Sequence, residues 1–129
     1  MKTDTDAIEG HFGDGKTFGI NAYYSVEDSP LGRGGAIKAG FPSVPESAET
    51  VVVLNGDIIT DETLDRLLTA HRERKSANTS HLATIMVVPM VSPYGLVDID
   101  GSDTITGFRE KVEMDQWINA GIYLFERSI

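Results

Sequence analysis

The sequence predicts an α/β fold with a parallel strand–helix–strand core followed by an antiparallel hairpin. Two apolar runs, residues 51–54 and 82–90, flank a segment at 61–75 whose leucines recur at helical spacing. Such apolar runs are typical of strands buried on both faces, and this order of elements implies a right-handed parallel crossover. The alternating segments 95–100 and 104–108, separated by Gly-Ser-Asp, predict the hairpin.

Composition limits the class of protein. The 129 residues are 40% apolar and 24% charged, which predicts one globular domain spanning residues 1–129. Eleven basic and twenty acidic residues give a net charge of -9, which argues against a nucleic-acid or anionic-membrane partner. The chain lacks cysteine, an apolar run long enough to span a membrane and a signal-peptide pattern at its start, so we expect a cytoplasmic protein.

Several elements are expected before the core. Two glycines flanking an aspartate at 13–15 predict a tight turn, and the aromatic-rich segment 18–26 predicts a strand. Residues 31–39 place three glycines ahead of an apolar-periodic stretch, which predicts a glycine loop opening a brief helix that ends near Gly40 and Pro42. Backbone in such a loop can approach a flat or phosphorylated ligand closely, although the spacing matches neither the Rossmann nor the P-loop motif.

The stretch 51–60 begins with the four apolar residues 51–54, which are expected to form the central strand, buried on both faces, with Asp57 just past its carboxyl end. Open α/β sheets bind their ligands at this position, and a carboxylate there is a plausible Mg²⁺ ligand. A simple turn explains Asn-Gly-Asp equally well, and the tripeptide alone favours that interpretation. In the following helix His71 shares the apolar stripe with the leucines, so we expect a partly buried structural histidine. Residues 119–125 predict the last strand.

Six segments in one order carry a family resemblance: FGDG from Phe12, YYSVEDSPLGRGGAI, VVVLNGD, VPMVSPYGLVDID, ITGFREK and NAGIYLF. Together they resemble the sugar-1-phosphate nucleotidyltransferases (nucleoside-diphosphate-sugar pyrophosphorylases), and the mannose-1-phosphate guanylyltransferase-like branch most closely. The resemblance covers the chain from about Ile8 onward. It implies a Rossmann-like mixed sheet that joins a nucleoside triphosphate to a sugar 1-phosphate and releases pyrophosphate, helped by Mg²⁺ and basic groups.

The resemblance also implies roles for single residues. Asp57 matches the metal-binding aspartate, and we expect it and Lys111 to be the catalytic residues. Gly34 and Gly35 match a loop that lies against the nucleobase. The implied contacts to the sugar and its phosphate are Tyr94, Gly95, Glu110, Lys111 and Asn119. Without the resemblance, Glu110 and Lys111 would be a solvated charge pair, and the others ordinary turn residues.

Departures from the family pattern shape the functional expectation. The sequence lacks the glycine-rich, arginine-containing signature G-G-x-G-T-R-L and a second metal-binding aspartate, Arg33 stands where threonine is usual, and Val112 replaces a proline. We therefore expect a fold truncated at both ends, with weak Mg²⁺ binding. Loss of the first strand would expose an apolar edge, so we also expect a homo-oligomer, most simply a dimer.

Three interpretations of function stay open at this point. The first is a truncated relative that binds a sugar phosphate or nucleotide sugar and is not a competent catalyst alone, because each lost positioning contact can cost orders of magnitude in rate. The second is an active nucleotidyltransferase completed by oligomerisation or by a partner chain. The third is a non-enzymatic assembly module with a vestigial site.

Overall fold

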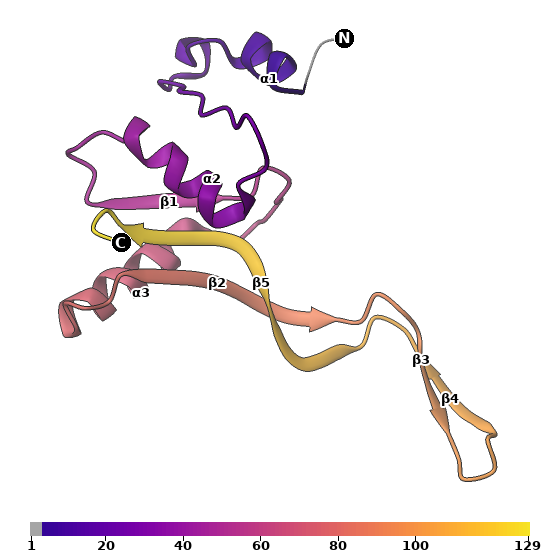
Figure 1. The fold of residues 1–129 in the computed structure, drawn as a ribbon. Coiled ribbons are helices and arrows are strands. Elements are labelled where there is room, and N and C mark those ends of the chain that lie inside the picture. Colours follow the sequence, from indigo (N-terminus) through magenta and orange to yellow (C-terminus); the bar gives the residue numbers. More distant parts are fainter. Residues whose placement is uncertain (1–3) are drawn as a thin grey trace. The chain divides into compact units, whose positions relative to one another are not determined.

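The computed structural model describes residues 4–129, and the chain divides into two compact units, Met1–Glu49 and Thr50–Ile129 (Figure 1). The first unit is helical: it contains α1 (Asp4–Phe12), the 3-10 turn η1 (Lys16–Phe18), α2 (Gly32–Gly40) and η2 (Phe41–Ser43). The second unit carries two sheets and the longest described helix, α3 (Leu64–Ala77). No helix within residues 4–129 combines the length and the apolar character needed to cross a membrane.

The expected tight turn at 13–15 is confirmed, and Gly15 shows why glycine is required there. Its φ is 80°, and the amide of Gly15 donates to the Phe12 carbonyl at 2.9 Å. A Cβ at Gly15 would lie 2.8 Å from Cγ1 of Ile20 and 2.9 Å from the Ala22 nitrogen, closer than real Cβ contacts come. A side chain at this position would therefore require the following segment to move.

The strand expected at 18–26 is wrong. Phe18 ends η1, and residues 21–27 have no regular secondary structure. This segment makes local contacts: the Ala22 amide donates to the Asp14 carbonyl at 2.9 Å, and the Tyr24 hydroxyl donates to the Gly13 carbonyl at 2.7 Å. A strand forms only when its backbone finds a partner strand, and within the described part of the chain this segment pairs with none.

The brief helix expected near 31–40 is confirmed, but its glycines do not form a loop ahead of it. Gly34 and Gly35 lie inside the first turns of α2, which starts at Gly32. The helix ends at Gly40, and the following 3-10 turn begins at Phe41 with Pro42 as its second residue. Glycine lowers helix stability, so the four glycines among the nine residues of α2 disfavour a longer helix.

The main sheet of the second unit has the order β1 (Thr50–Leu54), β5 (Glu113–Glu126), β2 (Ala83–Val91), as Figure 1 shows. β5 is antiparallel to both neighbours, so β1 and β2 run in the same direction, as predicted, without pairing with each other. The expectation that the 51–60 run is the central, doubly buried strand is wrong. β1 is an edge strand of this sheet, and Leu54 is 50% exposed.

α3 packs on one face of this sheet and supplies its core. The strongly periodic segment predicted at 61–75 forms the helix from Leu64, after Thr63 as its N-cap. Its apolar stripe meets the central strand, where Ile122 and Leu124 are fully buried. The core cluster consists of Leu67, Ile122 and Leu124, with Leu64, Leu68 and Met86 packed around it.

The predicted hairpin and last strand are both confirmed, and the last strand is longer than expected. β3 (Leu96–Ile99) and β4 (Ile105–Arg109) pair antiparallel, and Asp100 accepts the amides of Ser102 and Thr104 in the turn between them. β5 starts at Glu113 rather than Asn119, because residues 113–118 pair with the distal half of β2. The two strands thus form a ribbon that leads from the main sheet to the hairpin (Figure 1).

Candidate functional site

Asp57 lies in a turn directly after β1, as predicted. The Asn55 amide donates to the Gly121 carbonyl of β5 at 2.9 Å, and the Ile58 amide donates back to the Asn55 carbonyl at 3.3 Å. These two bonds close the 55–58 turn and join it to β5. The Asp57 side chain is exposed within the turn, so its carboxylate is available to a ligand from solvent.

Gly121 of β5 is the residue on which this turn rests. Its φ is 74°, and a Cβ there would lie 2.6 Å from Nδ2 of Asn55 and 3.0 Å from Cγ1 of Ile58. A side chain would therefore meet both ends of the turn that carries Asp57. Both the backbone conformation and the packing require glycine at this position.

Asn119 is connected to the same place through Gly121. Its Oδ1 accepts the Gly121 amide at 2.8 Å, and its Nδ2 donates to the Tyr123 hydroxyl at 2.6 Å. The structure thus brings two of the predicted site residues, Asp57 and Asn119, to one region at the carboxyl end of β1. The role of Asn119 as a substrate contact stays a prediction.

Four other predicted residues meet at the base of the hairpin. Tyr94 and Gly95 precede β3, Glu110 and Lys111 follow β4, and the pairing of Leu96 with Arg109 places the two segments opposite each other. Tyr94, Glu110 and Lys111 are exposed, and Lys111 has a φ of 51°. An exposed ammonium here would be free to meet a phosphate.

Gly95, a predicted contact to the sugar, lies against an aromatic ring of the protein itself. A Cβ at Gly95 would overlap the Phe108 side chain of β4, whose ring covers this glycine. The buried Ser92 hydroxyl donates to the Tyr94 carbonyl at 2.8 Å, and the Ser92 amide donates to the Val112 carbonyl at 2.8 Å. These bonds fix the two segments at the base of the hairpin.

The β2–β5 ribbon separates the pair Asp57 and Asn119 from the predicted site residues at the base of the hairpin. Asn119 is opposite Val87, whereas the far end of the ribbon is the pair Val91 and Glu113. Four residues of strand correspond to about 13 Å. Gly34 and Gly35 belong to α2 of the other unit, and their contact with a nucleobase stays a prediction.

Asp57 is the residue predicted to hold Mg²⁺, and this role stays a prediction. Among residues 4–129 no group of three or more histidine, aspartate or glutamate side chains comes together in a way that could hold a metal ion. Mg²⁺ is often held by one or two carboxylates together with substrate phosphates. Asp57 fits that kind of site, in which oxygens of a bound phosphate complete the coordination.

A buried polar network at the opposite end of the sheet was not predicted. Glu126 is 5% exposed and accepts hydrogen bonds from Lys75 Nζ, from His71 Nε2 at 2.9 Å and from Thr50 Oγ1 at 2.9 Å. The Lys75 ammonium, then the His71 and Thr50 hydrogen bonds, lower the pKa of Glu126 to about 2. Burial of His71, 1% exposed, agrees with its predicted place on the apolar stripe.

Thr84 extends this network. Because a carboxylate only accepts, Nε2 of His71 carries a proton and donates to Glu126. Nδ1 of His71 lies 2.8 Å from the Thr84 hydroxyl, and Nε2 of His81 lies 2.8 Å from the same oxygen. The chain of contacts ties α3, β1, β2 and β5 together at the end of the sheet away from Asp57. A histidine on an apolar stripe is its one local sequence signal.

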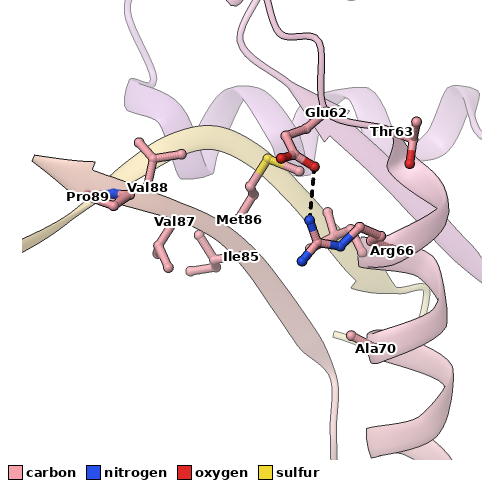
Figure 2. A pocket seen from close by; sticks show the side chains of 10 residues that line it. Glu62, Thr63, Arg66, Ala70, Ile85, Met86, Val87, Val88 and Pro89 are labelled. Atoms are coloured by element: carbon pink, nitrogen blue, oxygen red, sulfur yellow. Dashed lines mark hydrogen bonds and ion pairs between the residues drawn. The ribbon is translucent and has the colours of Figure 1, made fainter.

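An open apolar groove of about 380 Å³ lies between α3 and β2 (Figure 2). Its walls include Leu67 and Ala70 of the helix and Met86 of the strand. At its rim Arg66 pairs with Glu62 at 3.2 Å, as the dashed line in Figure 2 marks. The lining contains none of the predicted site residues.

Comparison with known proteins identifies the family to which this fold and these motifs belong. The chain resembles the crystal structure of HddC from Yersinia pseudotuberculosis with a TM-score of 0.57 and 26% identity, over 97% of this chain and 53% of that one. A second structure of HddC is a complex with GMP-PN. This likeness confirms the predicted α/β fold of the nucleotide-diphospho-sugar transferase type. The profile of the family described as "Nucleotidyl transferase" matches residues 1–129, and the chain belongs to that family.

Two curated relatives with similar sequences are both guanylyltransferases by name. The mannose-1-phosphate guanylyltransferase of Mycobacterium tuberculosis is 36% identical over 127 residues, which are 95% of this chain and 33% of the relative. The D-glycero-alpha-D-manno-heptose 1-phosphate guanylyltransferase of Campylobacter jejuni is 35% identical over 125 residues, which are 96% of this chain and 52% of the relative. The predicted resemblance is thus confirmed, and the chain spans between a third and about half of the length of these relatives.

Proposed function

We propose that this chain binds a sugar 1-phosphate or a nucleoside-diphosphate sugar through the surface that carries Asp57. The 55–58 turn supports this most directly. It lies at the carboxyl end of β1 in a member of this family, it is joined to β5 by a backbone hydrogen bond, and it carries the exposed carboxylate of Asp57. Ligands of open α/β sheets bind at such strand ends. The names of two relatives, both guanylyltransferases acting on a hexose or heptose 1-phosphate, suggest the ligand class.

The residue roles in this proposal follow from their chemistry. Lys111 would neutralise a phosphate, Glu110 would accept from sugar hydroxyls, Tyr94 and Gly95 would border the sugar, and Gly34 and Gly35 would border a base. Mg²⁺ held by Asp57 would supply charge neutralisation on the phosphates. In the complete reaction a sugar phosphate oxygen would attack the α-phosphorus, the bond from that phosphorus to the α,β-bridging oxygen would break, and pyrophosphate, made of the β- and γ-phosphates, would leave with that bond's electron pair.

We further propose that residues 1–129 alone bind without efficient turnover. No group of three or more ligating side chains comes together within residues 4–129, so we expect Mg²⁺ to bind weakly, and each missing positioning group costs orders of magnitude in rate. Thermal-shift titration with GDP-mannose tests the binding, because a ligand of the folded state raises the melting temperature. Release of pyrophosphate from GTP and mannose 1-phosphate above background would refute the proposed lack of turnover, and no thermal shift at millimolar ligand would refute binding.

The exposed apolar residues of the main sheet favour a second candidate, a homo-oligomer that completes or replaces the site. Leu54 of β1 is 50% exposed, and Ile85 and Val87 of β2 are each 49% exposed, on the two edge strands. Open sheet edges and exposed apolar side chains can pair with or pack against another chain. Light scattering during size-exclusion chromatography tests this, and a stable monomer at micromolar concentration would refute it.

A cytoplasmic location remains our proposal, supported by the absence of cysteine from the sequence.

A further inference from the structure

We propose that Asn119 is a positioning residue: its side chain holds Gly121 in the left-handed conformation that lets β5 accept the 55–58 turn, and so fixes the place of Asp57. This inference rests on the proposed function only in assigning Asp57 to the ligand. The positioning itself depends on contacts within the protein. It gives Asn119 a different role from the direct substrate contact that the family resemblance implies.

The first step concerns the amide of Asn119. Its oxygen is an acceptor for the Gly121 amide, and its nitrogen donates to the Tyr123 hydroxyl. The Gly121 amide can only donate, so it requires the oxygen of Asn119 on its side, and the amide orientation is fixed. Both ends of the side chain are thus occupied within β5.

The second step concerns the irregularity of β5 at this point. Tyr123 pairs with Ile85 and Asn119 pairs with Val87, so three residues of β5, 120–122, lie opposite the single residue Met86 of β2. Extra residues of this kind form a bulge, which bends a strand and redirects its neighbours. Gly121, with its φ of 74°, lies in the middle of the bulge, and the side chain of Asn119 spans it.

The third step connects the bulge to Asp57. The Gly121 carbonyl accepts the Asn55 amide at the start of the turn, and a Cβ at Gly121 would come within 3.0 Å of the side chains of Asn55 and Ile58. Asp57 lies between these two residues in the sequence. A change in the Gly121 conformation would therefore move both ends of the turn, and with them the carboxylate.

The test measures the turn and the ligand separately in the full chain. Exchange of the Asn55 amide is followed by NMR in Asn119→Ala and Asn119→Asp, and GDP-mannose affinity is measured in parallel by thermal shift. We expect Asn119→Ala to speed Asn55 exchange roughly fivefold to tenfold, the factor expected for loss of one hydrogen bond, and to weaken GDP-mannose. Asn119→Asp should keep near-normal exchange, because a carboxylate still accepts from Gly121 and from the Tyr123 hydroxyl.

Asn78→Ala is the matched control, because Asn78 makes the same side-chain bond to the amide two residues later, with Ser80 at 3.0 Å, far from the site. Unchanged Asn55 exchange in Asn119→Ala would overturn the inference, and so would a uniform rise across α3, which would indicate global destabilisation. If Asn55 exchange rises locally while the wild-type chain binds no GDP-mannose, the positioning role stands and the proposed function fails.

Discussion

Replacement of Glu126 by glutamine should remove the charge at the centre of the buried network while keeping its shape. Glu126 receives hydrogen bonds from Thr50, His71 and Lys75, all of which donate. A glutamine amide offers one oxygen in place of two and adds two hydrogens. At least one of the three donors then faces an NH₂ group, and the Lys75 ammonium loses its counter-charge.

The pKa of Glu126 sets the expected magnitude. Lowering that pKa from 4.5 to about 2 is equivalent to about 3 kcal/mol of stabilisation by linkage. The Lys75 side chain is 40% exposed, so water screens part of this interaction, and we expect a loss on the order of 2 kcal/mol at pH 7. That is a substantial fraction of the 5–15 kcal/mol that is typical for domain stability.

The sign of the pH dependence follows from the lowered pKa. The carboxylate contribution is fully present above pH 4.5 and is lost as the pH falls toward about 2. Urea unfolding of wild type and Glu126→Gln at several pH values measures this, with Glu113→Gln on the exposed start of the same strand as the control. The difference should vanish near pH 2. A difference that is independent of pH between 7 and 2.5 would refute the electrostatic explanation.

Three further predictions concern the site. Gly121→Ala should cost about 2–4 kcal/mol in urea unfolding because of strain and overlap with Asn55, whereas Gly56→Ala, which meets open space, should cost under about 1 kcal/mol. Gly95→Ala should displace the Phe108 ring and speed amide exchange across the hairpin. The double variant Gly95→Ala with Phe108→Ala, which lacks that ring, should restore slow exchange. Asp57→Asn should abolish the GDP-mannose thermal shift in Mg²⁺ while leaving the unfolding midpoint unchanged, because the side chain is exposed.

Local patterns predicted the elements of the second unit well, because each depends on its own residues. The apolar run of β1, the periodic leucines of α3 and the Gly-Ser-Asp turn of the hairpin all form where expected. The order of strands was not predictable in this way. β5 enters between β1 and β2 from a segment about sixty residues further along the chain than β1, and no local spacing encodes that choice.

The prediction of a strand at residues 18–26 was wrong for a related reason. Its aromatic and β-branched residues favour a strand, but this preference describes a fit to a half-buried pleated surface rather than an intrinsic backbone state. Where no neighbouring strand pairs with it, the segment keeps turn-like contacts such as the Tyr24 hydroxyl to the Gly13 carbonyl. The prediction identified the preference correctly and could not supply the partner.

The candidate site shows the same division between local and distant information. The sequence placed Asp57 at a strand end, and that placement holds. Gly95 is predicted to contact the sugar, and this stays a prediction, whereas only the structure shows that the Phe108 ring covers Gly95. The partnership of His71 with Glu126 joins residues 55 positions apart, so the apolar stripe could predict burial of the histidine but not its carboxylate partner.

The carboxyl end and the middle of β5 differ in how they are held, and this difference bears on function. At its carboxyl end Glu126 is anchored by charge-assisted bonds to α3 and β1, whereas near Asn119 the strand bulges and is held by neutral hydrogen bonds. Charge-assisted bonds are roughly twice as strong as neutral ones. Local opening should therefore begin at the bulge, where the 55–58 turn is attached. A ligand bound to Asp57 would pay to order that turn, which makes the hydrogen bonds of Gly121 a determinant of affinity as well as of stability.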